Sequence, residues 1–186
     1  KALGAAEGVV LRTEFKAGVE AYLDSTSPTQ VKTRTLADVI AFNRAHANAE
    51  MPLFGQELFE QAQATKGLAD PEYLAALATG RRLAGPEGID RLLKENRVEA
   101  LVAPTMGPAW LIDPVWGDRS GGGRVGSLAA VTGYPHLTVP MGQVQGLPVG
   151  LSLIGPAWSE AKLLSLGYAF EQMTGERRSP KLAKKR

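Results

Sequence analysis

Cysteine is absent from the 186 residues of this chain, which excludes disulfides, thiol nucleophiles and cysteine-ligated metal sites. No apolar run approaches the roughly 18 to 20 residues that a membrane-spanning helix needs, so a soluble chain is predicted, either cytoplasmic or exported. A strong excess of charge is missing as well, because 21 basic side chains are balanced by 19 acidic ones, for a net charge of +2. We therefore expect neither a nucleic-acid nor a membrane partner.

Hydrophobic residues make up 44% of the sequence, which is enough for a core. A chain of this length buries roughly 70% of its unfolded surface on folding, so residues 1–186 are predicted to form a single domain. The first residue is Lys1 rather than an initiator Met, and residues 1–10 lack the long apolar core of a signal peptide. A missing beginning is the simplest interpretation, and a fragment can keep its fold while losing its chemistry.

Residues 1–98 show apolar positions at helical spacing with charged residues between them. Thr35 is placed to cap a helix whose first turn carries Asp38. A second start signal, Asp70-Pro71-Glu72, combines an N-cap, a proline at the first helical position and an early acid. The predicted helices are Leu3–Leu23, Thr35–Ala49, Gln56–Lys66 closed by Gly67, Pro71 to about Gly85, and a separate helix from Pro86 that holds Ile89, Leu92 and Leu93.

Residues 99–186 show a different pattern. Short runs rich in Leu, Val and Ile end at Pro or Gly and predict buried strands at Glu99–Ala103, Leu137–Val139 and Val149–Ile154. A last helix is predicted from Ser159 until shortly before Gly175. Helices followed by apolar strands are typical of a sheet with helices packed on it. The predicted fold class is therefore α/β, with a helical amino-terminal half packed with a mixed sheet in the carboxyl-terminal half.

The segment Gly121-Gly122-Gly123-Arg124-Val125-Gly126 matches the G-x-G-x-x-G pattern of dinucleotide-binding loops. Its context does not fit, because no strand precedes the loop and no acidic residue between Asp118 and Glu160 could bind a ribose hydroxyl. A flexible glycine turn is the better interpretation. No cofactor is predicted.

Two serines lie in partial nucleophile motifs. Ser159-Glu160-Ala161-Lys162 fits the S-x-x-K pattern, in which a lysine activates a serine, but the accompanying motifs of that chemistry are absent. We interpret Ser159 as the cap of the last helix. Ser152 follows Gly150-Leu151 but lacks the closing glycine of a nucleophile elbow, so it is interpreted as structural.

The histidines of the sequence are His46 and His136. His46 lies among alanines and asparagines of a predicted helix and is expected at the surface, whereas His136 could line a pocket or cover a sheet edge. Without a third ligand there is no case for a metal site. Ser127, His136 and Asp113 could be combined into a Ser-His-Asp arrangement, but their spacing gives it no support.

Trp110, Trp116 and Trp158 lie in or near Gly- and Pro-rich loops beside predicted strand ends. Ligands bind at such positions in open α/β sheets. Two interpretations stay open: the indoles form a wall of a substrate pocket, or they cover the end of a core.

Several segments match motifs as a set. In the second half they are Val-Ala-Pro-Thr at 102–105, Gly-Pro-Ala-Trp at 107–110, Ala-Ala-Val-Thr-Gly-Tyr-Pro at 129–135, Thr-Val-Pro at 138–140 and Gly-Leu-Pro-Val-Gly-Leu-Ser-Leu-Ile-Gly at 146–155. In the first half they are Glu-Phe-Lys-Ala-Gly-Val-Glu-Ala-Tyr-Leu at 14–23 and Thr-Leu-Ala-Asp-Val-Ile-Ala-Phe-Asn at 35–43. Together they resemble the carboxyl-terminal part of the amidase signature family, in its peptide amidase and glutamyl-tRNA amidotransferase-like branch. The resemblance implies a partial amidase-signature fold.

The resemblance also implies a reaction, the hydrolysis of a carboxamide to an acid and ammonia through an acyl-enzyme. The family uses a serine nucleophile, a second serine in a cis peptide and a lysine base, which belong to its amino-terminal portion and its Gly-Ser-Ser-Gly-Gly stretch. This sequence contains no such stretch; the nearest string, at residues 120–123, lacks the serine pair. We therefore expect no catalytic residue here and no activity of the chain alone. By the same resemblance, Trp110 and Ser127 are the candidate substrate-binding residues.

Three functional hypotheses remain open. The chain is a fragment of an amidase, with the amino-terminal part of the parent and the parent's small amide substrate as partners. Alternatively, it is a non-catalytic subunit or degenerate homologue that acts as a binding module. Or it is a small independent enzyme that uses Ser127 or Ser152. A fragment leaves strand edges and apolar surface exposed, which predicts a homo-oligomer through the sheet edge or marginal stability.

Overall fold

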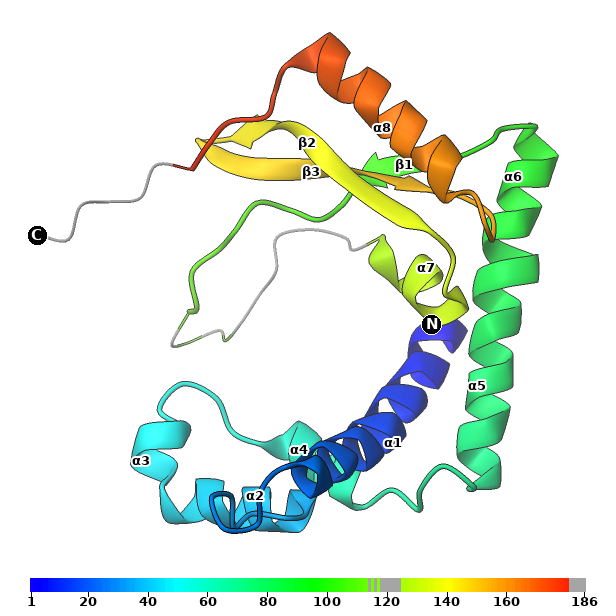
Figure 1. The fold of residues 1–186 in the computed structure, drawn as a ribbon. Helices are drawn as coiled ribbons and strands as arrows, with labels where there is room; N and C mark the ends of the chain where they lie inside the picture. Colours follow the sequence, from blue (N-terminus) through cyan, green and yellow to red (C-terminus); the bar gives the residue numbers. More distant parts are fainter. Residues whose placement is uncertain (114, 116, 118–124, 181–186) are drawn as a thin grey trace, which may run out of the picture. The chain divides into compact units, whose positions relative to one another are not determined.

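The computed structural model describes residues 1–113, 115, 117 and 125–180 and divides the chain into two compact units, 1–81 and 82–186 (Figure 1). The first unit is helical and the second contains a small sheet, which confirms the predicted α/β fold class. None of the helices in these described ranges has the length and apolar character that a bilayer crossing requires.

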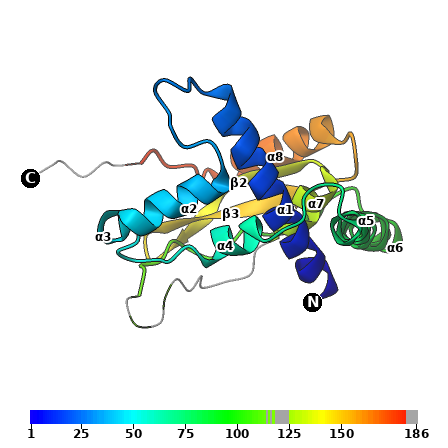
Figure 2. The ribbon, with the colours of Figure 1, turned by 90° about the horizontal axis from the view of Figure 1, so that it is seen from below.

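Figure 2 shows the helices of the first unit. Some of these helices pack around a small apolar core. Leu36, Ile40 and Ala62 are buried in this core, and Val19 and Phe59 pack against it. Its helices are α1 (Ala2–Ser25), α2 (Leu36–Ala45), α3 (Ala47–Glu50), α4 (Glu57–Gln63) and the first part of α5 (Pro71–Ala84).

The start of α2 follows the predicted cap. The Thr35 hydroxyl accepts a hydrogen bond from the Asp38 amide at 3.1 Å, and the Asp38 carboxylate accepts one from the Thr35 amide at 2.9 Å, which completes a capping box. The predicted continuation to Ala49 is wrong, because α2 ends at Ala45. His46 leaves the helical region there, and its ring stacks on Phe42.

Helix α4 is shorter than the predicted Gln56–Lys66. The Thr65 hydroxyl donates to the Ala62 carbonyl at 2.7 Å and so satisfies a carbonyl of the last turn after the helix has ended. Gly67 has φ +98° but lies in the following turn, where its carbonyl accepts from the Asp70 amide. Gly67 therefore does not close α4.

The predicted break at Gly85-Pro86 is wrong as well. Helix α5 passes directly into a π-helical segment, η1 (Gly85–Asp90), and then into α6 (Arg91–Asn96). A π segment widens the turn, and Pro86 lies at its beginning, where a missing N–H and a fixed φ are tolerated. The two predicted helices therefore form one uninterrupted helix with a local bulge.

The second unit carries a three-stranded sheet in the order β1-β3-β2, and both pairings among the described residues are antiparallel rather than the predicted mixture. Its strands are β1 (Leu101–Pro104), β2 (His136–Val144) and β3 (Leu147–Ile154), so all three predicted strands are confirmed, with β2 longer than predicted. The β2–β3 hairpin turns at Gln145-Gly146, both with positive φ. Helix α7 (Gly126–Thr132) was not predicted, whereas α8 (Glu160–Thr174) ends before Gly175 as expected.

The two faces of this sheet have different surroundings. Helix α8 lies over one face in Figure 1, where Leu163 is buried against Val139 and Leu153. On the other face Ile154 packs with Ile89 and Leu93 and with Ala129 of α7. Ile89 and Leu93 lie on the uninterrupted helix formed by α5, η1 and α6, which we call the long helix. Beyond Ile154 this second face becomes polar, and it is there that the strands bring together hydroxyl and imidazole groups.

Candidate functional site

The polar face of the sheet carries a chain of hydrogen bonds between side chains of β2, of β3 and of the residue that follows β1. His136 Nε2 lies 2.6 Å from Ser152 Oγ, and Ser152 Oγ donates to Thr105 Oγ1 at 2.9 Å. Thr105 Oγ1 lies 3.4 Å from Thr138 Oγ1, which is a longer and weaker contact. Ser152 is completely buried, and we call Thr105, His136, Thr138 and Ser152 the hydroxyl cluster.

Strand alternation explains why these residues share a face. His136 and Thr138 are two residues apart on β2, and Thr138 pairs directly with Ser152 on β3. Thr105 follows β1, and its amide donates to the Gly150 carbonyl at 2.8 Å, which extends the β1–β3 pairing by one step. The hairpin register therefore sets the positions of all four side chains.

The direction of the bonds limits the chemistry of the cluster. A serine hydroxyl has a single proton, and Ser152 gives its proton to Thr105, so His136 Nε2 is the donor towards Ser152. An activated serine needs the opposite arrangement, in which a base accepts the serine proton. The arrangement of Ser152 and His136 thus favours a structural cluster over a nucleophile with its base.

The predicted pocket residues lie on the two segments that flank the Gly-rich region. Trp110 is half-buried in an irregular segment after β1 and interacts with another residue of the chain. Ser127 is half-buried as the second residue of α7. Their role in substrate binding stays a prediction. Trp116 and residues 121–124 of the predicted glycine turn lie outside the described residues.

The Ser-His-Asp combination gains no support. Nε2 of His136 is engaged with Ser152 rather than with Ser127, and Asp113 accepts from the Val115 amide at 2.8 Å within a local turn. His46 is exposed, as expected, and its ring nitrogen Nδ1 contacts the Phe42 carbonyl oxygen at 2.9 Å. Within the described ranges no group of three His, Asp or Glu side chains could hold a metal ion.

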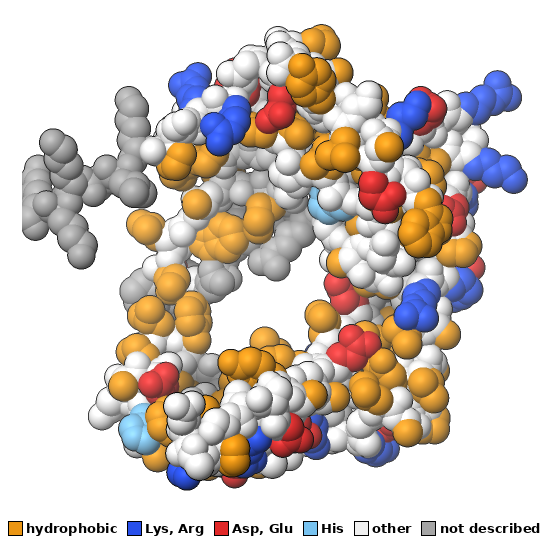
Figure 3. Space-filling view, in the orientation of Figure 1, with side chains coloured by type: hydrophobic (Ala, Val, Ile, Leu, Met, Phe, Trp, Pro, Cys, Tyr) orange, Lys and Arg blue, Asp and Glu red, His pale blue; other side chains and the backbone are white. Residues whose placement is uncertain are grey.

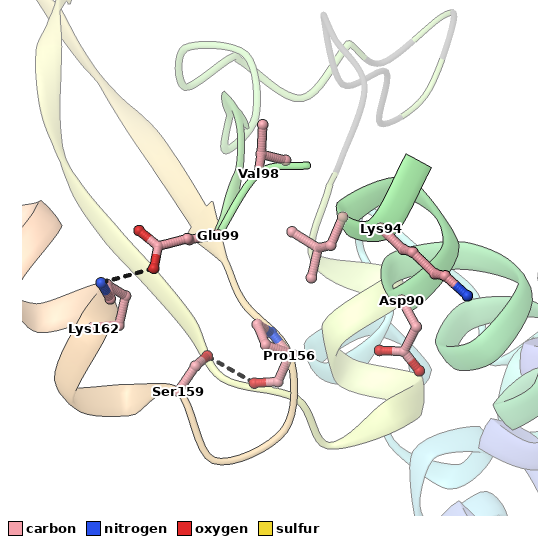
Figure 4. Close-up of a pocket in the computed structure, with 8 residues that line it drawn as sticks. Asp90, Lys94, Val98, Glu99, Pro156, Ser159 and Lys162 are labelled. Carbon is pink, nitrogen blue, oxygen red and sulfur yellow. Dashed lines mark hydrogen bonds and ion pairs between the residues drawn. The ribbon is translucent and has the colours of Figure 1, made fainter. Parts of the chain in front are cut away.

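An open cleft of about 450 Å³ lies elsewhere in the second unit (Figure 4). Figure 4 shows Glu99 turned towards Lys162 of α8, with Asp90 and Lys94 of the long helix on the opposite wall. The Lys162 ammonium lies 3.0 Å from the Glu99 carboxylate. Its positive charge is therefore neutralised by Glu99 and is not directed at a serine.

Ser159 in this cleft corrects one prediction. It occupies the N-cap position of α8, but its hydroxyl makes no capping bond and donates instead to the Pro156 carbonyl at 2.7 Å. Trp158 immediately before it has φ +64° and is 92% exposed. The turn before α8 thus satisfies the Ser159 hydroxyl locally, which leaves the S-x-x-K pattern without a serine–lysine contact.

Asp90, on the opposite wall of the cleft, is hydrogen-bonded to Tyr134, which lies just before β2. The Tyr134 hydroxyl donates to the Asp90 carboxylate at 2.9 Å, and this bond raises the pKa of Tyr134 above its ordinary value, with a smaller contribution from desolvation. The cleft therefore combines two satisfied carboxylates with two lysines. It offers no pair of serine and base.

Comparison with known proteins adds the missing context. No family model matches the chain. A solved structure of native peptide amidase from Stenotrophomonas maltophilia is 53% identical and superposes with a TM-score of 0.85, over 97% of this chain and 35% of that chain. A structure of the peptide amidase PAM with the competitive inhibitor chymostatin is also 53% identical, with a TM-score of 0.87, over 97% of this chain and 36% of that chain.

A curated protein from Arabidopsis thaliana, named a probable amidase, is 36% identical over 177 residues, which is 94% of this chain and 30% of that protein. The chain thus spans about a third of the length of the relatives it matches. Its fold is that of a portion of an amidase hydrolase. The chain belongs to the amidase signature family, which confirms the resemblance found in its motifs.

Proposed function

We propose that this chain is the carboxyl-terminal part of an amidase-signature hydrolase whose complete form cleaves the C–N bond of a carboxamide. The observation that supports this proposal most strongly is the structural match to peptide amidase, which covers 97% of this chain but only 35% of that chain. In the reaction of the parent, a serine oxygen gives up its proton and attacks the amide carbon, the C–N bond breaks as the nitrogen takes up that proton and leaves as ammonia, and water then hydrolyses the acyl-enzyme to the acid and the free serine. An amidated peptide is the substrate class that the similarity supports first.

The chain alone is inactive in this proposal. Its sequence contains no pair of adjacent serines, whereas the family's nucleophile lies in a Gly-Ser-Ser-Gly-Gly stretch. The buried Ser152 fits this view, because its proton is committed to Thr105 and its neighbour His136 acts as a donor. Loss of nucleophile and base leaves at best residual catalysis.

The partner of the chain is the amino-terminal part of the parent. Strand β1 lies at the edge of the sheet, and among the described residues no further strand pairs with its outer side. Val102 on this strand is 62% exposed although it is apolar. A strand with an unpaired edge and an exposed apolar side chain can pair with a strand from another segment, which we propose belongs to the amino-terminal part of the parent.

The test compares this chain with the complete reading frame to which it belongs. Ammonia release from an amidated dipeptide is measured for both purified proteins, and their intact masses are determined. We expect release by the complete protein only, with a serine pair encoded upstream of Lys1. Turnover by the isolated chain that disappears on Ser127→Ala or Ser152→Ala contradicts the proposal and supports the small independent enzyme.

Trp110 and Ser127 are proposed to contact the substrate of the complete enzyme. Trp110→Ala and Ser127→Ala in that enzyme are each expected to raise KM by about 10-fold, since one lost contact to the bound substrate costs on the order of 1.4 kcal/mol. Trp158→Ala is the matched control, because this indole is almost fully exposed at another place in the unit. Unchanged KM values for both variants contradict this assignment.

Without its partner, the isolated chain is proposed to self-associate through the β1 edge. Light scattering after size exclusion is expected to show a dimer or larger species. Val102→Lys is expected to shift it towards the monomer, because a charge on an edge strand opposes pairing. A wild-type chain that stays monomeric at high concentration contradicts this part of the proposal.

A further inference from the structure

We propose that the hydroxyl cluster is a positioning device: Ser152, acting through Thr105, holds in place the two segments that carry Trp110 and Ser127. The step from position to substrate binding rests on the proposed function. The positioning itself concerns only contacts within the second unit.

Thr105 is the junction of this device, because three of its polar groups are bonded to different parts of the unit. Its amide donates to the Gly150 carbonyl at 2.8 Å, which fixes the end of β1 on the central strand. Its carbonyl accepts from the Val125 amide at 3.4 Å, at the residue before α7 begins. Its side chain accepts from the buried hydroxyl of Ser152 at 2.9 Å.

Thr105 lies close in the chain, or by a hydrogen bond, to both segments that carry the candidate binding residues. Trp110 follows Thr105 by five residues, and Ser127 follows Val125 by two. The segment that leaves β1 and the segment that enters α7 are therefore tied to the sheet at the same residue. A change in the rotamer of Thr105, or in the end of β1, moves the starting points of both segments.

Gly150 shows that the cluster is built into the sheet. A Cβ at this position would lie 2.6 Å from Thr138 Cγ2 and 2.9 Å from Thr105 Oγ1. Any larger residue on this face of β3 would push the two threonine side chains apart. The absent side chain of Gly150 thus makes the space in which Thr105 reaches Ser152.

Ser152 is suited to hold Thr105 because it is fully buried and bonded on both sides. Its hydroxyl accepts from His136 Nε2 and donates to Thr105 Oγ1. Removal of this hydroxyl takes away the partner of His136 Nε2 and leaves Thr105 Oγ1 with only its 3.4 Å contact to Thr138, and groups that lose a hydrogen bond seek new partners or water. His136 completes the device by holding the Ser152 hydroxyl in the orientation that donates to Thr105.

The first experiment measures position directly, by hydrogen–deuterium exchange in this chain. Thr105→Val and Ser152→Ala each remove a hydroxyl from the cluster, and Thr105→Ser keeps it. Ser159→Ala is the matched control, since it removes a hydroxyl bonded at 2.7 Å elsewhere in the same unit. Helix α8 serves as an internal reference in every variant.

We expect Thr105→Val and Ser152→Ala to accelerate exchange at least about 10-fold in residues 106–113 and 125–132, with α8 unchanged, because only local opening becomes easier. Thr105→Ser and Ser159→Ala are expected to keep wild-type rates. Unchanged exchange in both segments overturns the proposal. Equal acceleration in α8 overturns it too, because the cluster would then support the whole unit rather than position two segments.

The second experiment links position to function in the complete enzyme. The same variants are assayed for ammonia release from an amidated dipeptide, and we expect Thr105→Val and Ser152→Ala to raise KM by about 5- to 10-fold with kcat within about twofold, as for lost positioning of binding groups. Lower kcat at unchanged KM overturns the link. An unsubstituted complete protein that releases no ammonia instead overturns the proposed function, and the exchange result still decides the positioning.

Discussion

Gly88 lies so close to the carbonyl oxygen of Leu83 that a Cβ at residue 88 would be 2.6 Å from that oxygen. Leu83 lies near the end of α5 and Gly88 lies in η1, five positions apart, which is the spacing that a π-helical turn brings together. The same turn presents buried Ile89 to the core shared with α7 and Ile154. The bulge thus depends on a residue without a side chain at position 88.

Gly88→Ala is therefore expected to destabilise the chain by about 2 kcal/mol, since the added methyl group must displace a backbone carbonyl in a packed turn. Urea unfolding followed by circular dichroism measures the change. Gly18→Ala is the matched control in α1, where a Cβ meets no atom within 4 Å. There we expect a gain of up to about 1 kcal/mol from helix propensity. A gain for Gly88→Ala would contradict the described packing.

How much of the fold was predictable depends on the range of the interactions that determine it. The start of α2 was predicted correctly because Thr35 and Asp38 are three residues apart and complete their own capping box. The passage through Gly85 and Pro86 was not, because Pro86 matches a local helix-start signal while the segment packs against α7, which is distant in sequence. A Cβ at Gly85 would lie 3.4 Å from Thr132, which is 47 residues away in sequence.

The candidate site could not be predicted fully either, because its hydrogen bonds join residues that are far apart in sequence. Ser152 lies 47 residues from Thr105, and its interpretation as structural could not include a partner. The available signal was the Gln145-Gly146 dipeptide between two apolar runs, which predicts a hairpin and hence its register. With that register, His136 and Thr138 fall on the face of Ser152. The family resemblance, in contrast, was visible because motifs are read along the chain.

A second prediction concerns the contact between α8 and the sheet. Leu163 is 2% exposed and packs against Val139 and Leu153. Leu163→Ala is expected to cost about 3 kcal/mol, from lost burial and the cavity that remains. Leu164→Ala is the neighbouring control, at a side chain that is 61% exposed, and should change stability by about 0.5 kcal/mol or less. Hydrophobic side chains reach the surface over α8 in Figure 3. Equal effects of the two variants would show that α8 is not docked as described.

A third prediction tests the bond between Tyr134 and Asp90. Tyr134→Phe removes the donor and is expected to lower the free energy of unfolding by about 1 kcal/mol at pH 7. The pKa of Tyr134 is raised by its bond to Asp90, so this contribution is complete below the ordinary tyrosine pKa of about 10 and is lost as pH rises through the higher folded value. Chemical unfolding at pH 7 and at alkaline pH should show a difference that shrinks. Tyr168→Phe, at a 66% exposed ring, is the control.

The last prediction concerns Asp38 in the capping box of α2. Backbone hydrogen bonds from Arg34 and Thr35, together with the Thr35 side chain, lower the pKa of this carboxyl, with the Arg34 amide as the largest cause. A lowered pKa in the folded state means that ionised Asp38 stabilises the fold above the unfolded value of about 4, and that this contribution is lost as pH falls through the folded value. Asp38→Asn should therefore be less stable than the wild type at pH 7.

This difference between wild type and Asp38→Asn should shrink as pH falls below the unfolded value of about 4 and through the lowered folded pKa of Asp38, because the wild-type carboxyl then becomes neutral like the amide. Urea unfolding of both proteins across this pH range provides the measurement. Glu50→Gln is the control for the loss of a carboxylate, because the Glu50 side chain is exposed and makes no hydrogen bond or ion pair within the described part of the chain, although its backbone amide donates to the His46 carbonyl. If the Asp38→Asn difference persists undiminished at acid pH, the carboxylate charge is not what stabilises the start of α2, and the hydrogen-bond geometry alone must account for it.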